Sequence, residues 1–189
     1  LCTTRAGGVS TGPCASLNLG SHVGDDPSAV QANRQRLQAV VQGATPGARA
    51  VFLNQVHGTA VATINPATPD GTEADACVAT QPGAVCTIMV ADCLPVLLAH
   101  GSGAVVGAAH AGWRGLAGKG GVGVLEAVFE RFKALALSDK ALAAIKNEAN
   151  RMLAAHTMAW LGPCIGPTAF EVGAEVREAF CSHHPAALA

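Results

Sequence analysis

The stretch VCTIMVADCLPVLLAHGSGAVVGAAHAGWRG, residues 85–115, decides the fold class of this chain. Its apolar residues fall into runs at 85–91, 95–99 and 104–109. Short apolar runs bounded by turn residues are typical of buried strands. A membrane helix needs about 18 uninterrupted apolar residues, whereas Asp92, Pro95 and His100 interrupt this stretch. The stretch therefore predicts several buried strands and no membrane span.

Helical patterns surround these strands. Asp25 or Asp26 followed by Pro27 is a typical helix start, because an acidic side chain caps the first turn and proline fits its first position. The expected helices cover about 25–42, 118–137, 139–156 and 173–182, and further strands are expected at 76–79, at 158–162 and as a pair within 49–64 joined at His57 and Gly58. No internal repeat or linker divides the chain. We therefore expect one α/β domain over residues 1–189.

Composition excludes several classes of protein. With 50% hydrophobic and 13% charged residues the chain is too apolar to be disordered. Its 12 basic and 13 acidic residues are not clustered, which argues against nucleic acid as a partner. The seven cysteines form no C-x-x-C pair, and the first residues show no secretion signal, which favours reduced thiols in a cytoplasmic protein. The oligomeric state is left open.

Three residues of metal-ligand type stand at the ends of predicted strands. They are His57 in NQVHG, Cys93 in ADC and His110 in AHAGWRG. Two imidazoles and one thiolate suit Zn²⁺, and three protein ligands leave a fourth position open for water or substrate. A cysteine beside a histidine also suits a thiolate nucleophile oriented by a carboxylate such as Asp92. A cysteine buried in a strand is commonly an inert core residue, so the residues alone leave three interpretations open.

Arg114 follows the same motif at a predicted strand-to-helix turn. A guanidinium there, beside outward-pointing backbone amides, suits a phosphate or a carboxylate. The alternative is a surface arginine packed along Trp113. The glycine-rich segment 115–123, GLAGKGGVG, lacks the residue order of a nucleotide-phosphate loop and is expected to form a turn.

Five motifs in collinear order resemble a known family. They are TTRAGGVSTGPCASLNLGSHVGDD, FLNQVHG, ADCLPVLL, AHAGWRGLAGKG and WLGPCIGPTAFEVG. The family has long been labelled multicopper polyphenol oxidase or laccase-like. Its members are described as purine nucleoside phosphorylases with adenosine deaminase activity, and bacterial members include a peptidoglycan-editing factor.

The resemblance implies a fold, a metal and a substrate. The implied fold is a single-domain α/β sandwich with a mixed β-sheet core, similar to the catalytic domain of cytotoxic necrotizing factor. Zinc, or copper in its place, would be held by catalytic residues His57, Cys93 and His110. The substrates would be a purine nucleoside and phosphate, with Arg5, Arg114, Asp75 and Asp92 as the candidate residues for binding them or for proton transfer. Family members continue past the FEVG motif, so we expect part of the C-terminal segment to be missing.

Two other functions remain as alternatives. The likeness to cytotoxic necrotizing factor, a Cys–His deamidase, keeps open a hydrolase or amidase acting on cell-wall precursors. The older family label keeps open a copper-dependent polyphenol oxidase. Enzymes with several copper centres use many histidines, commonly in H-x-H pairs, whereas this chain has seven histidines and no such pair. A single His/His/Cys site can still accept copper, because Cu²⁺ binds most such sites more tightly than Zn²⁺.

Overall fold

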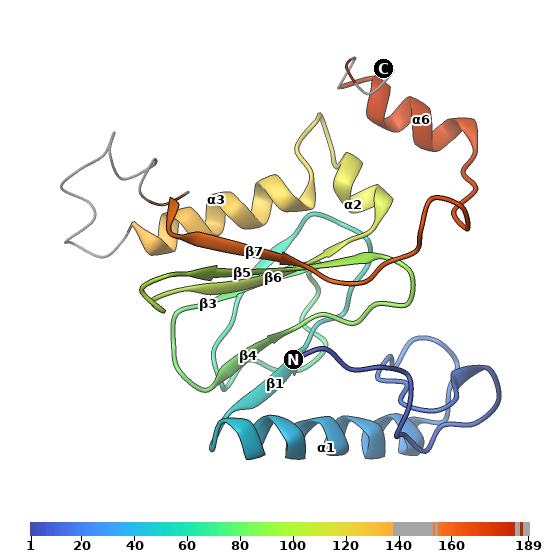
Figure 1. Cartoon of the computed structure of the whole chain (residues 1–189), viewed down its shortest axis with the longest axis vertical. Coiled ribbons are helices and arrows are strands. Elements are labelled where there is room, and N and C mark those ends of the chain that lie inside the picture. The colour runs from blue at the N-terminus through green and yellow to red at the C-terminus, as the bar shows by residue number, and fades with distance from the viewer. Residues whose placement is uncertain (138–152, 154, 184–185, 187–189) are drawn as a thin grey trace. The chain divides into compact units, whose positions relative to one another are not determined.

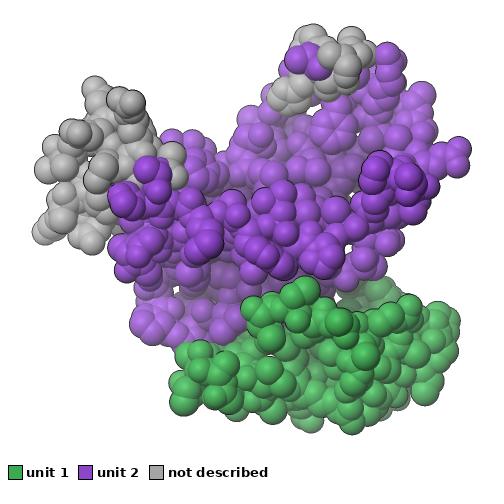
Figure 2. All heavy atoms as spheres, viewed as in Figure 1, with its two compact units in different colours: residues 1–50 green, residues 51–189 purple. Residues whose placement is uncertain are grey.

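A computed structural model describes residues 1–137, 153, 155–183 and 186 (Figure 1). In chain order the elements are η1 (Gly12–Cys14), α1 (Pro27–Ala44), β1 (Arg49–Phe52), β2 (Val61–Thr63), β3 (Ala76–Ala79), β4 (Ala84–Thr87), β5 (Leu94–His100), β6 (Val106–Ala111), α2 (Trp113–Ala117), α3 (Val124–Ala136), β7 (Thr157–Leu161) and α6 (Ala174–Cys181). The chain forms two compact units, Leu1–Ala50 and Val51–Ala189, which Figure 2 shows in green and purple. No described helix is both long enough and apolar enough to cross a membrane.

Unit 1 contains the helix expected after the paired aspartates. The Asp26 side chain accepts a hydrogen bond from the backbone N–H of Ser28, and Pro27 occupies the first position of α1. These contacts satisfy one of the unpaired amides at the helix start, and proline has no amide to satisfy. The predicted start is confirmed, and the helix ends at Ala44, slightly beyond the expected Gln42.

Polar side chains, of which that of Asn33 is fully buried, hold the N-terminal loop of unit 1 onto α1. Asn33 Oδ1 accepts from Val9 N at 2.9 Å, and its Nδ2 donates to Asn18 O at 2.8 Å. Asp25 Oδ2 accepts from Ser10 Oγ at 2.6 Å and from Asn18 Nδ2 at 2.9 Å. These bonds give the glycine-rich loop a defined path without a large apolar core.

A five-stranded mixed sheet organises unit 2, with the strand order β2-β3-β6-β5-β7. Strands β2 and β3 are parallel, and the remaining neighbours are antiparallel. A second sheet consists of β1 and β4. The predicted α/β class with a mixed sheet is confirmed. The similarity to cytotoxic necrotizing factor stays a prediction.

At the interior strand β3 both faces of the five-stranded sheet are buried. Successive side chains of a strand point to opposite faces, so Ala76 and Val78 of β3 pack with Val128 and Phe132 of α3. Cys77, the residue between them, packs on the other face in a cluster with Val51, Leu53 and Ile64. The helix α3 lies along the sheet (Figure 1). This double coverage explains why the central strands consist of apolar runs and do not alternate with polar residues.

Several element boundaries differ from those expected. The paired strands expected within 49–64 stop at Phe52 and resume at Val61, with a loop between them. The strand expected at 85–91 ends at Thr87, and the one expected at 104–109 is β6, which extends to Ala111. Each shortened strand gives way to a loop that carries a candidate ligand.

The helices after β6 also differ from the expected pattern. The helix expected from 118 begins at Val124, after a turn in which Gly118, Gly120 and Gly121 have positive φ. The five-residue α2, which precedes that turn, was not expected. The helix expected at 139–156 falls largely outside the described residues, and β7 and α6 lie close to their predicted positions. Glycine-rich residues thus form the predicted turn and delay the start of the expected helix to Val124.

Strand β7 lies at one edge of the sheet, where it pairs with β5. Three of its large apolar side chains are exposed, with 69% of Met158, 43% of Trp160 and 62% of Leu161 accessible. Consecutive residues of a strand point to opposite faces, so both faces of β7 are open at this edge.

Candidate metal centre and active site

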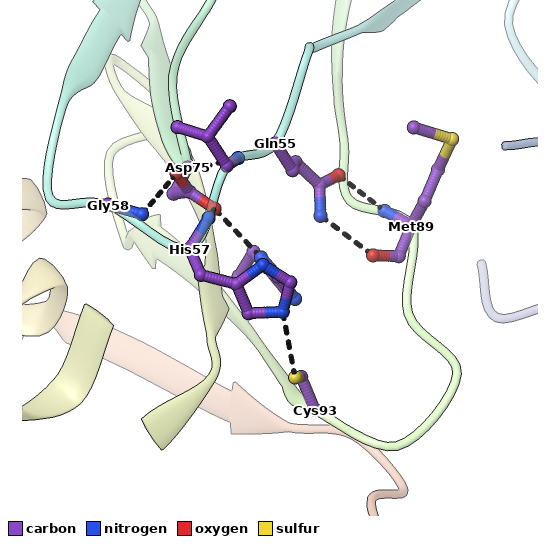
Figure 3. Close-up of polar contacts among 8 residues, drawn as sticks. Gln55, His57, Gly58, Asp75, Met89 and Cys93 are labelled. Carbon is purple, nitrogen blue, oxygen red and sulfur yellow. Dashed lines mark hydrogen bonds and ion pairs between the residues drawn. The ribbon is translucent and has the colours of Figure 1, made fainter. Parts of the chain in front are cut away.

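The three predicted ligand residues come together in unit 2. One potential ligand atom from each of His57, Cys93 and His110 lies within 4.8 Å of the other two. The two imidazole rings are 4.7 Å apart between centroids and nearly perpendicular, at 72°. Cys93 Sγ is 3.8 Å from His57 Nε2 (Figure 3). Within the described part of the chain, no other group of three His, Cys, Asp or Glu side chains is arranged in this way.

His110 is fixed by both its backbone and its ring. It lies on β6, and its backbone N–H donates to Asp75 O at 2.7 Å, directly beside the β3–β6 ladder. Its ring Nδ1 is 2.9 Å from Asp75 Oδ1, and the side chains of the two residues are 5% and 0% exposed. Because a carboxylate only accepts, Nδ1 carries the hydrogen of this bond. In the neutral ring, Nε2 is therefore left as the atom available to a metal.

His57 lies on a tight turn with a left-handed backbone, at φ 62°. This conformation costs a non-glycine residue about 1–2 kcal/mol. It aligns three successive amides, and Val56, His57 and Gly58 all donate to the Asp75 carboxylate, at 3.1, 2.8 and 2.6 Å (Figure 3). Successive N–H groups of this kind form an anion-binding concavity. Here the anion is a side chain of the protein itself.

Asp75 is expected from the sequence to bind substrate, but the structure places it beneath the two histidines. It is fully buried, and its two oxygens accept four hydrogen bonds. Burial by itself raises the pKa of this carboxyl, but the hydrogen bonds from His110 and from the backbone of Gly58, Val56 and His57 outweigh it and hold the pKa below its ordinary value. Asp75 is therefore an ionised group at the base of the cluster, in contact with both histidine-bearing segments.

The loop before β5 supplies Cys93. Gln55, which is 8% exposed, ties this loop to the His57 turn: its Nε2 donates to Met89 O at 2.8 Å and its Oε1 accepts from Met89 N at 2.9 Å (Figure 3). Burial, followed by the negative charges of Asp92 and Asp75, raises the pKa of the Cys93 thiol. The sequence pattern assigns Gln55 no role, because it is one of several polar residues in the NQVHG motif.

Gly112 brings the backbone directly against the cluster. A Cβ atom at this position would lie 2.8 Å from His57 Cδ2 and 3.0 Å from Cys93 Sγ. Gly115 makes a similar approach on the next turn, where a Cβ would lie 3.0 Å from Gly58 O. Both glycines therefore permit a close backbone approach, Gly112 to His57 and Cys93 and Gly115 to the turn that carries His57.

The remaining candidate residues lie at more exposed positions. Arg114 is on α2, with its guanidinium carbon 4.4 Å from the centroid of the Trp113 ring. Asp92 is exposed and directly precedes Cys93. Arg5 belongs to unit 1, where its Nε and Nη2 donate to Ala15 O at 2.8 and 2.6 Å. The structure therefore places Arg114 and Asp92 on segments adjoining the cluster, whereas Arg5 contacts its own unit.

The donor set fits a single transition-metal ion. Two imidazoles and one thiolate are the ligands that Zn²⁺ prefers, and a three-residue set is typical of catalytic sites. The contact between Asp75 and His110 is the carboxylate–histidine arrangement that orients metal ligands in proteins. His57, Cys93 and His110 are thus the residues that would hold the ion.

Comparison with known proteins places this chain in a family. The family model described as multi-copper polyphenol oxidoreductase laccase matches residues 1–189. The chain is 47% identical over 182 residues to a purine nucleoside phosphorylase of Pseudomonas aeruginosa, covering 96% of this chain and 63% of the relative. It is 47% identical over 178 residues to the purine nucleoside phosphorylase YfiH of Escherichia coli strain K12, covering 94% of this chain and 63% of that protein.

Solved structures of related proteins have the same fold as this chain. A Neisseria meningitidis protein matches with a TM-score of 0.77 and 42% identity, over 97% of this chain and 65% of its own. YlmD from Geobacillus stearothermophilus matches with a TM-score of 0.69 and 30% identity, over 94% of this chain and 62% of its own. The chain thus spans somewhat less than two thirds of the length of these relatives. With the family model matched along its whole length, the chain belongs to the laccase-like multi-copper polyphenol oxidoreductase family.

Proposed function

We propose that this chain carries the active site of a zinc-dependent enzyme that acts on purine nucleosides. Two reactions are proposed: adenosine and phosphate give adenine and ribose 1-phosphate, and adenosine and water give inosine and ammonia. The observation that carries the proposal is the His57–Cys93–His110 cluster. The names of the relatives support phosphorolysis, and deamination rests on the family resemblance. Because the relatives are longer than this chain, both activities are proposals for it.

Different residues of the chain are proposed to bind the metal ion and to transfer protons. A zinc ion with an open position lowers the pKa of its bound water to about 7. His57, Cys93 and His110 would hold the ion. Asp92, exposed beside Cys93, is the carboxylate proposed to pass protons to the purine and to the departing ammonia.

Phosphorolysis depends on holding phosphate against the ribose carbon. Arg114 is proposed for this task, because it follows Gly112, which lies against His57 and Cys93. A guanidinium stacked on an indole keeps its N–H edge available for two parallel bonds to phosphate. Arg5 is proposed as a second group for phosphate or the ribose, in the longer protein.

One contact favours a second candidate function. The 3.8 Å separation of Cys93 Sγ and His57 Nε2 is compatible with a Cys–His hydrolase or amidase. The same thiol has a raised pKa, owing first to burial and then to nearby carboxylates, which disfavours the thiolate nucleophile. Copper in the same His/His/Cys set is the remaining alternative, and it agrees with the family description.

Metal analysis and product analysis together test the proposal. Protein purified without added metal is expected to hold about one zinc per chain. Adenosine is expected to give inosine whether or not phosphate is present. Adenine and ribose 1-phosphate are expected only when phosphate is present. Cys93→Ser should lose metal and both activities together, whereas Cys164→Ser, at an exposed cysteine, should lose neither. A covalent adduct on Cys93 would favour the hydrolase, stoichiometric copper would favour the oxidase, and a zinc-loaded protein that forms neither product contradicts the proposal.

A further inference from the structure

We propose that Asp75 is the positioning residue of the metal centre: one buried carboxylate sets the tautomer of His110 and the backbone geometry of His57 at the same time. This inference rests on the proposed metal site. It gives Asp75 a role different from substrate binding. Asp75 acts through the two ligands and does not reach the reacting atoms.

The first part of the argument concerns His110. The ring is buried, and its Nδ1 lies 2.9 Å from Asp75 Oδ1. A neutral imidazole has one N–H and one lone pair, and an ionised carboxylate offers no hydrogen to share. The contact therefore selects the tautomer with the hydrogen on Nδ1 and the lone pair on Nε2. Without Asp75 both tautomers would be populated, and only one of them binds a metal through Nε2.

The second part concerns His57. Its left-handed backbone is uncommon for a residue with a side chain. The turn persists because three amides in a row, those of Val56, His57 and Gly58, find a single acceptor group in Asp75. Removing the carboxylate would leave these donors without that partner and release the turn to more common conformations. The His57 ring would then lose its fixed position beside Cys93.

The count of donors explains why an amide would not replace the acid. Oδ2 accepts from Val56 and Gly58, and Oδ1 accepts from His57 and His110. All four partners donate, and asparagine offers one acceptor oxygen and one donating NH₂ group. In Asp75→Asn an NH₂ group at the Oδ2 position would face two fixed N–H donors, those of Val56 and Gly58. At the Oδ1 position it would face one fixed donor, the N–H of His57, and the His110 ring, which can change its tautomer, so this orientation is favoured. Facing the ring, it reverses the tautomer and places the hydrogen on Nε2.

The experiment compares Asp75→Asn with Val128→Ala, a core substitution on α3 that lowers stability without touching the cluster. The first readout is the tautomer of His110 in the metal-free protein, from ¹⁵N NMR of histidine side chains. The second is cobalt titration, followed by the absorption of the cobalt–thiolate bond. We expect a single Nδ1–H tautomer in the wild type, its loss in Asp75→Asn, and a cobalt affinity about 10–100-fold lower.

The outcomes separate this inference from the proposed function. Retention of the Nδ1–H tautomer in Asp75→Asn would overturn the positioning role. So would a loss of cobalt affinity no larger than that of Val128→Ala. If the wild-type protein binds neither cobalt nor zinc, the proposed metal-dependent function fails, and the tautomer measurement still decides the role of Asp75 by itself.

Discussion

Gln55 and Met89 are joined by two hydrogen bonds, in which the side-chain amide of one pairs with both backbone groups of the other. This pair connects the turn that carries His57 to the loop that carries Cys93. The distance between a nitrogen and a sulfur ligand is therefore set by a residue that is itself no ligand. Such outer contacts commonly decide how well a metal site is formed.

Gln55→Ala is expected to lower the free energy of unfolding by about 1–3 kcal/mol, because the backbone groups of Met89 lose these partners in a partly buried position. Zinc affinity should fall as well. Denaturant unfolding and metal titration measure the two effects. Gln42→Ala, at an exposed position of α1, is the control and should change stability by no more than about 0.5 kcal/mol. Unchanged zinc affinity in Gln55→Ala would show that the connection has no bearing on the site.

Gly112→Ala is expected to abolish tight metal binding while the protein remains folded. The added Cβ would lie 2.8 Å from the His57 ring and 3.0 Å from the Cys93 sulfur, so one of the two ligands must move. Equilibrium dialysis with zinc measures the loss. Gly43→Ala is the matched control, because its Cβ meets nothing within 4 Å and alanine favours the α1 helix by about 0.5–1 kcal/mol. Full zinc binding by Gly112→Ala would contradict the close approach.

Arg114→Lys is expected to weaken phosphorolysis more than deamination, because lysine lacks the two-pronged geometry that grips phosphate and deamination consumes no phosphate. The rates of inosine formation and ribose 1-phosphate formation, measured over a range of phosphate concentrations, separate the two effects. Arg177→Lys, on the exposed side of α6, controls for a general effect of the exchange. Equal losses in both reactions would assign Arg114 a structural role on Trp113.

Asp25 is expected to contribute an acid-sensitive part of the stability of unit 1. Hydrogen bonds from Ser10 and Asn18 lower the pKa of Asp25 below its ordinary value of 3.8. A group with a lowered folded-state pKa contributes its full stabilisation above the unfolded pKa, and that contribution is lost as pH falls through the folded pKa. Asp25→Asn should therefore be less stable than the wild type at neutral pH, with the difference shrinking below about pH 4.

Unfolding curves at several pH values measure that difference. Glu171→Gln removes a negative charge at an exposed position outside unit 1 and serves as the control. Wild-type and Asp25→Asn curves that stay parallel across the acid range would contradict the contribution of Asp25.

The sequence predicted best where a local signal and the final contact coincide. Asp26 and Pro27 begin α1 as expected, because capping involves neighbouring residues only. Strand β3 has the predicted bounds, because a short buried run has few other solutions. The apolar residues on both sides of His57 and Gly58 predict two strands joined there, whereas the structure has a loop over residues 53–60. Its real shape depends on Asp75, a partner whose position in space no local pattern reveals.

In the candidate site, too, the features set by local sequence were predicted and those set by distant contacts were not. Residue type and motif were enough to select His57, Cys93 and His110, and the structure brings the three together. Asp75 was selected only as a nearby carboxylate, because sequence separation does not show which acid is buried beneath the ligands. Gln55 was missed, since an amide that pairs with a distant backbone leaves no periodic signature.

The shared carboxylate also sets an order of assembly. A ribosome releases His57 first, Asp75 next and His110 last. The turn at His57 gains its acceptor only when Asp75 arrives, and the ring of His110 gains its orientation only when β6 pairs with β3. A nascent chain that ends before β6 therefore has two of the three ligand residues and no formed centre. A metal held by this centre would therefore enter only after β6 has been synthesised and has paired with β3.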